Sequence, residues 1–437
     1  MKKYPKYKDS EVEWIGKIPD KWKLIKIKNT CEIVNEQIPQ SELNGKKVIH
    51  YSIPNVQQTG IGQLEDGDDI DSSKIIINGG EILFSKLNPR KGTTCFVSKN
   101  DEYQMVCSGE FITMIPKTNL PKFHLFVISC STFIQFIDSQ VESVTRSHQR
   151  VRPENFLSSL IPIPPLQEQQ QIVTYLDQKT SLIDQIISNS DKKIELLKEQ
   201  RTSTINHIVT KGLNPKVKMK DSGVEWIGEI PEGWEIRPLK MITDVRPSNV
   251  DKHIYPEEIQ VDLCNYTDVY KNEFVGLKTP LKQGSCNKTE YSRFNLKKGD
   301  VIITKDSESP NDIGIPCLII DDLPNVVCGY HLTLLRPTDI DGGFLYCVFQ
   351  TQYIKSYFET ESNGITRYSL GKSSIESTSI VFPPFQEQQQ IVTYLDQKTK
   401  EIDDLISSEQ RRIQLMKEYR QSLISEVVTG KIKVTEN

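Results

Sequence analysis

The stretch QEQQQIVTYLDQKT, Gln167 to Thr180, decides the organisation of this chain, because the same fourteen residues return unchanged from Gln386 to Thr399. A second repeat supports the duplication: DSEVEWIGKIPDKW (residues 9–22) matches DSGVEWIGEIPEGW (residues 221–234) at ten of fourteen positions. Repeats at a fixed spacing indicate a tandem duplication. We therefore expect two similar sites, held at a fixed separation.

Two prolines stand before each copy of the block, and more than forty residues without Gly or Pro follow. Proline is tolerated just ahead of a first helical turn, so each block is predicted to open a long helix. Gly212 and Gly430 mark matching helix ends. Apolar residues recur at heptad spacing over five heptads, which is typical of a coiled-coil seam. The expected seam residues are Val173, Leu176, Ile183, Ile187, Ile194, Leu197, Val392, Leu395, Ile402, Ile406, Ile413 and Met416.

The alternative is that each helix packs only along its own globular domain. The apolar stripe is narrow and very long, which favours helix–helix pairing. Two such helices in one chain pair most simply antiparallel, with the halves related by a pseudo-two-fold axis.

We predict an α+β fold with two mixed globular domains and two long helices that form an antiparallel intramolecular coiled coil. The predicted boundaries are 1–160 for the first domain, 161–212 for the first helix, 213–380 for the second domain and 381–437 for the second helix. Short apolar runs such as residues 74–77 and 81–84 are predicted strands. Residues 121–138 have roughly helical apolar spacing and are predicted to form one helix.

Composition places the chain among multi-domain globular proteins. Its 437 residues carry a net charge of −4, so a nucleic-acid role would have to rest on local basic patches. Nine scattered cysteines without a CxxC pair argue against a disulfide framework or a zinc site, and favour free thiols in a reducing cytoplasm. No apolar run is long enough to span a membrane, and no apolar segment follows the basic N-terminus as in a signal peptide.

Motifs of several enzyme classes fail on inspection. GITRYSLGKS (residues 364–373) has six residues between its glycines where a P-loop has four. FPPF (residues 382–385) lacks the polar first residue of an amino-methyltransferase motif, and the six histidines show no metal-ligand spacing. Asp177-Gln178-Lys179 has a nuclease-like form but lies in a predicted helix. We expect no catalytic and no metal site in this chain.

Basic residues gather at several places in the sequence. Residues 82–99 hold four basic residues and no acid, and residues 278–298 hold six against one Glu. A Thr-Arg pair stands shortly before each helix, at Thr145-Arg146 and Thr366-Arg367. Lys and Arg of this kind bind DNA phosphates, and Arg also reads base edges. The alternative for any single cluster is that it is a solvent-exposed loop that does not bind DNA. The residues predicted to contact DNA are Lys86, Arg90, Lys91, Arg146, Arg150, Arg152, Lys305, Arg367, Tyr368 and Lys372.

With these features, the chain closely resembles the specificity subunit of Type I restriction–modification enzymes. The resemblance rests on the order of divergent domain, PPLQEQQQI-type helix, divergent domain and PPFQEQQQI-type helix, and on the SGVEWIGEIPEGW opening. It covers essentially the whole chain.

The resemblance implies two target recognition domains, each binding one half of a bipartite sequence in double-stranded DNA. The paired helices would serve as a spacer and as a docking surface for two modification (methyltransferase) subunits, with restriction subunits further out. S-adenosylmethionine, ATP and Mg²⁺ would be held by those partners, and none by this chain. The alternatives from the residues alone are a coiled-coil scaffold that binds no DNA and a self-contained enzyme with an unrecognised site.

Overall fold

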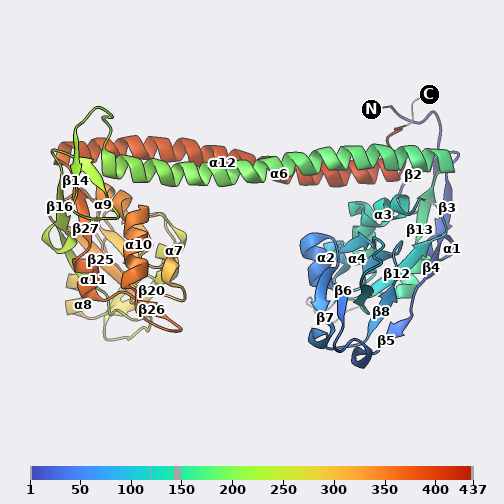
Figure 1. Cartoon of the computed structure of the whole chain (residues 1–437), viewed down its shortest axis with the longest axis horizontal. Coiled ribbons are helices and arrows are strands. Elements are labelled where there is room, and N and C mark those ends of the chain that lie inside the picture. Colours follow the sequence, from blue (N-terminus) through green and yellow to red (C-terminus); the bar gives the residue numbers. More distant parts are fainter. Residues whose placement is uncertain (1, 119, 142–148, 435–437) are drawn as a thin grey trace. The chain divides into compact units, whose positions relative to one another are not determined.

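The computed structural model describes residues 2–118, 120–141 and 149–434, and its contacts divide the chain into two compact units (Figure 1). The first unit comprises residues 1–191 and 410–437, and the second comprises residues 192–409. Each unit contains one globular part and portions of both long helices, α6 (Leu166–Lys211) and α12 (Phe385–Val428). Both globular parts mix strands with helices, as predicted.

Two sheets frame the globular part of the first unit. One has the strand order β10-β9-β12-β4 and the other β5-β8-β11-β6-β7, and all neighbours are antiparallel except β6 and β11. The predicted strands at residues 74–77 and 81–84 correspond to β8 and β9. The strands are β4 (Cys31–Ile33), β5 (Gln37–Ile38), β6 (Lys47–Tyr51), β7 (Gln63–Asp66), β8 (Lys74–Ile77), β9 (Ile82–Ser85), β10 (Thr94–Phe96), β11 (Gln104–Ser108) and β12 (Phe111–Pro116).

The prediction of one helix over residues 121–138 is wrong. The structure has two helices, α3 (Pro121–Ser129) and α4 (Ser131–Asp138), because Cys130 is extended at φ −71° and ψ 145°. The break turns α4 so that Phe133 and Ile137 are fully buried in the first core. Apolar spacing alone does not show it, since both helices are apolar on their inner faces.

The second unit repeats this plan with different lengths. Its sheets have the orders β17-β25-β21-β23-β19 and β20-β18-β24. The parallel pairs are β19 with β23 and β18 with β24. The strands are β17 (Thr243–Pro247), β18 (Ile259–Cys264), β19 (Phe274–Val275), β20 (Lys282–Cys286), β21 (Val301–Thr304), β23 (Pro316–Ile319), β24 (Val326–Cys328) and β25 (Leu332–Pro337).

Small two-stranded sheets complete both units. They pair β1 (Tyr7–Asp9) with β2 (Lys17–Pro19), β3 (Lys23–Lys26) with β13 (Leu160–Ile163), β14 (Met219–Asp221) with β15 (Glu229–Pro231), β16 (Glu235–Pro238) with β27 (Ser379–Phe382), and β22 (Asp306–Ser307) with β26 (Tyr368–Ser369). The remaining α-helices are α1 (Ile27–Thr30), α2 (Ile53–Thr59), α5 (Pro153–Ser158), α7 (Tyr266–Lys271), α8 (Lys288–Phe294), α9 (Gly342–Phe349), α10 (Gln352–Glu361) and α11 (Lys372–Glu376). Short 3-10 turns are η1 (Gln40–Glu42), η2 (Gly67–Asp69), η3 (Pro89–Lys91), η4 (Leu239–Met241) and η5 (Pro310–Asp312).

The long helices begin and end where the sequence places them. α6 starts directly after Pro165 and α12 directly after Pro384, and these prolines accept the amide hydrogen bonds of Gln169 and Gln388 at 3.0 Å. Gly212 and Gly430 adopt φ values of +77° and +73° beyond the helix ends. This left-handed conformation, which glycine adopts without strain, terminates a helix.

The ends of the helices are buried in the cores of the globular parts. In the first unit Leu176 of α6 and Val427 of α12 belong to the same core as Trp22 and Phe84. In the second unit Leu395 belongs to the core around Trp234. The alternative, that each helix packs on its own globular domain, therefore holds only for the helix starts. The C-terminal end of each helix lies in the core of the other half, as Val427 of α12 does.

Apolar residues in the middle of α6 and α12 are also buried, although they do not belong to the cores of the globular parts. Among the described residues of the second unit, Ile194, Leu197 and Ile402 are 6–7% exposed but belong to none of the apolar core clusters. Of the other predicted seam residues, Val173, Ile183 and Ile413 are buried, and Ile187, Val392, Ile406 and Met416 are half-buried.

Matched ion pairs join the two helices inside each unit. In the second unit Arg201 of α6 pairs with Asp403 of α12 at 3.2 Å, and Lys193 pairs with Glu409 at 2.7 Å. From one pair to the other the residue number rises along α6, from 193 to 201, and falls along α12, from 409 to 403. The two helices are therefore antiparallel there. In the first unit Arg420 pairs with Asp184, again at 3.2 Å. Arg420 and Asp184 are the repeat counterparts of Arg201 and Asp403, so the same contact is made twice with the helices exchanged.

In the described part of the chain, none of the helices combines the length and apolar character needed to cross a bilayer.

We predict that His124 makes the first unit sensitive to acid. Its ring on α3 is buried, neither ring nitrogen has a hydrogen-bond partner among the described residues, and burial lowers its pKa to about 4. The unfolded chain therefore binds this proton more readily than the folded chain. The histidine's contribution to stability is complete above pH 6.5 and is lost as the pH falls towards 4, by about 3 kcal/mol.

The measurement is the free energy of unfolding of wild type and His124→Leu between pH 8 and pH 4, with the exposed His253→Gln as the control. The gap between wild type and His124→Leu should shift by about 3 kcal/mol across this range. A gap that stays constant with pH would show that His124 does not titrate on unfolding.

Candidate nucleic-acid interface

The basic segment 82–99 meets the segment that carries Arg150 and Arg152 at the end of β9. The amide of Lys86 donates to the Glu110 carbonyl oxygen at 2.9 Å, and the Lys86 carbonyl accepts from the Val151 amide at 3.1 Å. Leu87 and Arg150 form an antiparallel bridge. The loop that follows β9 is thus joined by backbone hydrogen bonds to the segment that leads back to α5 and α6.

Arg150 is held by a carboxylate at this junction. Its Nε and Nη2 donate to the two oxygens of Glu110 at 3.0 and 3.1 Å, and this pairing raises the pKa of Arg150. The Arg150 side chain stays about half exposed. The arginine predicted to contact DNA is therefore fixed in orientation while part of its guanidinium still faces solvent.

The other predicted residues of the first half surround this pair. Arg90 and Lys91 are exposed on η3, and Arg90 donates to the side chain of Gln149 at 3.3 Å. Arg152 is exposed immediately before α5. Arg146 lies outside the described residues. Apart from Arg146 and the half-buried Lys86, the predicted residues of the first half are thus exposed on the strand-end loop and on the returning segment that pairs with it.

The second half builds the same backbone frame at the end of β21. The amide of Lys305 donates to the His331 carbonyl oxygen at 3.0 Å, and the Lys305 carbonyl accepts from the Leu370 amide at 2.8 Å. Strands β22 and β26 pair beside it. These bonds correspond one to one with those of Lys86, so Lys86 and Lys305 have equivalent backbone surroundings.

Different side chains occupy this second frame. His331 Nδ1 contacts Asp306 Oδ2, and Asp306 Oδ1 accepts from the Ser369 hydroxyl at 2.6 Å. Nη2 of Arg367 lies 3.3 and 3.2 Å from the two ring nitrogens of His331. Of the other predicted residues, Tyr368 packs against the second core, and Lys372 is half-exposed and pairs with Glu376 at 3.3 Å.

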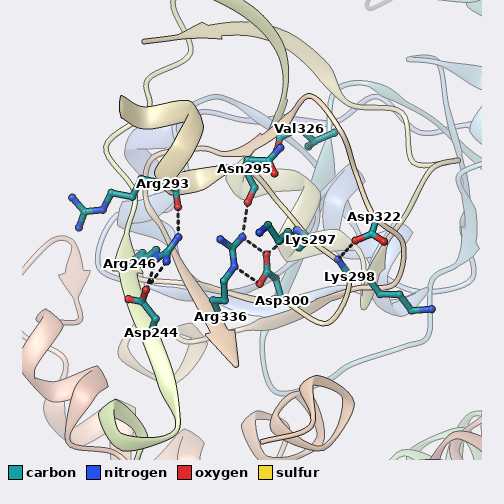
Figure 2. Close-up of polar contacts among 10 residues, drawn as sticks. All are labelled: Asp244, Arg246, Arg293, Asn295, Lys297, Lys298, Asp300, Asp322, Val326 and Arg336. Atoms are coloured by element: carbon teal, nitrogen blue, oxygen red, sulfur yellow. Dashed lines mark hydrogen bonds and ion pairs between the residues drawn. The ribbon is translucent and has the colours of Figure 1, made fainter. Parts of the chain in front are cut away.

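The basic segment 278–298 contains a second group of exposed cations. Its side chains Lys278, Lys282, Lys288, Arg293, Lys297 and Lys298 are all exposed. Figure 2 shows the polar contacts beneath part of this surface. Arg336 donates to both carboxylate oxygens of Asp300 at 2.9 and 2.7 Å, and to the Asn295 carbonyl at 2.5 Å.

A neighbouring arginine anchors the end of α8. Arg246 donates to Asp244 and to the Arg293 carbonyl oxygen at 2.7 Å, and its hydrogen bond lowers the pKa of Asp244 (Figure 2). Arg246 and Arg336 therefore hold the backbone of the segment in place, while Arg293, Lys297 and Lys298 project outward.

Sequence reasoning missed the partners of the predicted arginines. Glu110 and His331 hold the same structural position, directly before β12 and β25. Neither residue is basic and neither belongs to a known motif, so neither was selected from the sequence. Only the fold shows that they contact Arg150 and Arg367.

The cysteines are buried throughout and unpaired. Burial raises the pKa of thiols such as Cys95, to about 12. Within the described residues, no group of three or more His, Cys, Asp or Glu side chains is placed to hold a metal ion.

Comparison with known proteins places this arrangement in a family. The family model for the Type I restriction modification DNA specificity domain matches the chain twice, at residues 19–197 and 231–415. The chain is similar to the Type I restriction enzyme MjaVIII specificity subunit of Methanocaldococcus jannaschii, with 23% identity over 96% of this chain and 94% of that protein.

Two solved structures share the fold. One comes from work on complex assembly and conformational transition of the type I R-M system, with a TM-score of 0.71, 17% identity and coverage of 95% of this chain and 99% of the other. The other is the HsdS subunit from Thermoanaerobacter tengcongensis, with a TM-score of 0.50, 17% identity and coverage of 95% and 98%.

The chain belongs to the Type I restriction–modification DNA specificity family and carries two copies of its DNA specificity domain. The family supplies DNA recognition and leaves catalysis to other subunits.

We predict that substituting two arginines shown in Figure 2 affects different properties: Arg336 matters for stability and Arg293 for DNA binding. Arg336→Gln should destabilise the chain by about 3–5 kcal/mol, because Asp300, whose side chain is 2% exposed, then lacks its cationic partner. Arg293→Gln should leave stability unchanged and lower the slope of DNA affinity against salt concentration by about 1.

Chemical unfolding and DNA titration at several salt concentrations measure both effects. Equal destabilisation by the two variants, or an unchanged salt slope for Arg293→Gln, would contradict the division into anchoring and DNA-facing residues.

Proposed function

We propose that the chain is the sequence-specific DNA-binding subunit of a Type I restriction–modification complex, in which each recognition domain reads one half of a bipartite target. The observation that carries this proposal is the duplicated backbone frame at Lys86 and Lys305, which presents different side chains in the two halves. Two domains that share one fold but present different side chains to DNA are expected to recognise two different half-sites. Partner subunits would carry out adenine methylation or restriction.

The long helices act as the spacer in this proposal. In it α6 and α12, which lie within the predicted segments 161–212 and 381–437, form an antiparallel coiled coil between recognition domains at residues 1–160 and 213–380. The repeated ion pairs Arg201–Asp403 and Arg420–Asp184 support this pairing. A rigid spacer reads the distance between half-sites without contacting the intervening bases. It also makes the second contact intramolecular once the first is made.

DNA binding would combine positioning and reading. The exposed Lys91 and the exposed cations of residues 278–298, together with the half-buried Lys86 and Lys305, suit phosphate contacts, which fix the protein on the duplex. Arg150 and Arg367, each held by a neighbouring side chain, suit contacts to bases. The complex would act in the cytoplasm, with S-adenosylmethionine, ATP and Mg²⁺ on the partner subunits.

The identical block supports docking of two copies of the same partner. Four of its residues are exposed in both copies and follow one face of the helix at spacings of 3, 4 and 4. Internal packing does not require identity at such positions, whereas one partner surface bound twice does. The residues are Gln167, Gln170, Thr174 and Gln178 on α6, and Gln386, Gln389, Thr393 and Gln397 on α12.

Matching crevices lie beside the two stripes. The first unit has a crevice of about 550 Å³ that includes Asp177, Thr180 and Asp184. The second unit has one of about 490 Å³ that includes Asp396, Thr399 and Asp403, their repeat counterparts. Equivalent surfaces in both units suit two modification subunits.

Exchanging one recognition domain tests the function. A chain in which residues 20–160 come from another family member should, in complex with modification subunits, methylate a motif changed in one half only. Sequencing of adenine methylation in cells that express the complex measures this, with exchange of residues 235–380 as the matched control. Changes in both half-sites, or methylation without a bipartite motif, would contradict the proposal.

Charged substitutions on the exposed stripes test the docking. Gln170→Arg and Gln389→Arg should each leave only one modification subunit bound, and the double variant should bind none. Native mass spectrometry counts the subunits, and Gln200→Arg, an exposed residue of α6 outside the block, is the control. Retention of two subunits by the double variant would locate the partners elsewhere.

A further inference from the structure

The same three-part frame occurs once in each half. The residue directly before β12 is Glu110, and the residue directly before β25 is His331. The backbone carbonyl of each accepts a hydrogen bond from the backbone amide of a lysine, Lys86 or Lys305. That lysine accepts in turn from the segment returning to the long helix. The frame therefore holds three chain segments at one place by backbone bonds alone, which leaves the side chains on it free to differ.

In the first half, the frame presents an arginine oriented by a carboxylate. Glu110 receives the Nε–H and one Nη2–H of Arg150. A guanidinium has five N–H donors, so this side-on pairing leaves the opposite edge, formed by Nη1 and Nη2, available. That edge matches the O6 and N7 acceptors of guanine in the major groove.

In the second half, the frame presents an arginine beside an imidazole. His331 contacts Asp306 and Arg367 from a backbone φ of +68°. Such a conformation is costly for a residue other than glycine and persists where the surroundings hold it. Nη2 of Arg367 is almost equidistant from the two ring nitrogens, so the guanidinium lies over the imidazole. Within the described residues, no hydrogen bond engages Nε or Nη1 of Arg367.

An exposed apolar side chain lies close to this second arginine. Asn363 and Ser369 bond to each other through both backbone amides, at 3.2 and 3.0 Å, and close a short hairpin. A Cβ at Gly364 would stand 1.9 Å from the Arg367 carbonyl oxygen, so the closed hairpin requires glycine there. Ile365 in this hairpin is 94% exposed. In the major groove, apolar side chains can contact the methyl group of thymine.

We infer that this frame is the specificity-determining position of both halves: Arg150 and Arg367 each read a guanine, one in each half-site. Glu110 positions Arg150, His331 with Asp306 positions Arg367, and Ile365 contacts a neighbouring thymine methyl. This inference rests on the proposed function. Beyond that function, it identifies the side chains that contact bases and the side chains that only position them.

The test uses the full chain in complex with its modification subunit, and a library of randomised DNA duplexes from which bound molecules are selected and sequenced. Wild type should yield a bipartite motif with a guanine in each half. Arg150→Gln should lower the preference for guanine about tenfold or more at one position of one half, and Arg367→Gln should do so in the other half. Ile365→Ser should reduce a thymine preference next to the Arg367 guanine.

The positioning residues have a separate readout. Glu110→Gln and His331→Asn, the latter chosen because Asn tolerates a positive φ, should weaken the same guanine preference without altering the other half-motif. A merely structural role would instead weaken binding to all sequences alike. Lys91→Gln, on the loop that pairs with the Arg150 segment, is the control and should reduce affinity evenly across the library.

The outcomes separate the inference from the function on which it rests. If wild type selects no bipartite motif, the proposed function itself fails. If wild type selects one but either half lacks guanine, or the arginine variants keep their guanine preference, the inference is wrong and the function stands. Variants are compared only where their thermal unfolding matches wild type, and the milder Glu110→Gln and His331→Asn decide the matter if an arginine variant does not fold.

Discussion

The structure depends on one contact that is made twice, between a tryptophan indole and a glutamate at the start of a long helix. Trp22 Nε1 donates to Glu168 at 3.1 Å, and Trp234 Nε1 donates to Glu387 at 2.9 Å. Both tryptophans are almost fully buried, and an indole N–H buried without an acceptor would cost about 1–3 kcal/mol. Each glutamate also lies in the first helical turn, where the helix dipole favours a negative charge.

The end of the other helix lies against the same contact. A Cβ at Gly430 would be 3.2 Å from the Trp22 ring and 2.3 Å from Pro19, and one at Gly212 would be 3.1 Å from the Trp234 ring. The two repeated sequences therefore meet in each unit, with the glycine that ends one helix beside the glutamate that begins the other. Side chains larger than glycine would disturb this junction, which explains why a glycine with positive φ stands at both helix ends.

Each half therefore combines features that are the same in both units with side chains that differ between them. The junction, the helix starts and the backbone frame at Lys86 and Lys305 are alike in both units and carry the architecture. Each frame carries an arginine, but the partner of that arginine differs: Glu110 holds Arg150, and His331 contacts Arg367. The proposed function, in which one partner is bound twice and two different half-sites are bound once each, would require this division. The geometry can then stay constant while the recognition chemistry changes.

Much of this organisation was determined by the sequence itself. Exact repetition located the halves and helix starts, because proline, glycine and heptad spacing act locally and need no tertiary context. Other features depended on contacts between distant residues. The break at Cys130 follows from burying Phe133 and Ile137 in the first core, and apolar spacing does not record it. Likewise, Glu110 and Arg150 are 40 positions apart, and only the packing of β9, β12 and the returning segment brings the carboxylate to the guanidinium. Local propensities set where elements begin and end, whereas the pairing of recognition side chains belongs to the tertiary fold, because it is the fold that decides which distant segments share a surface.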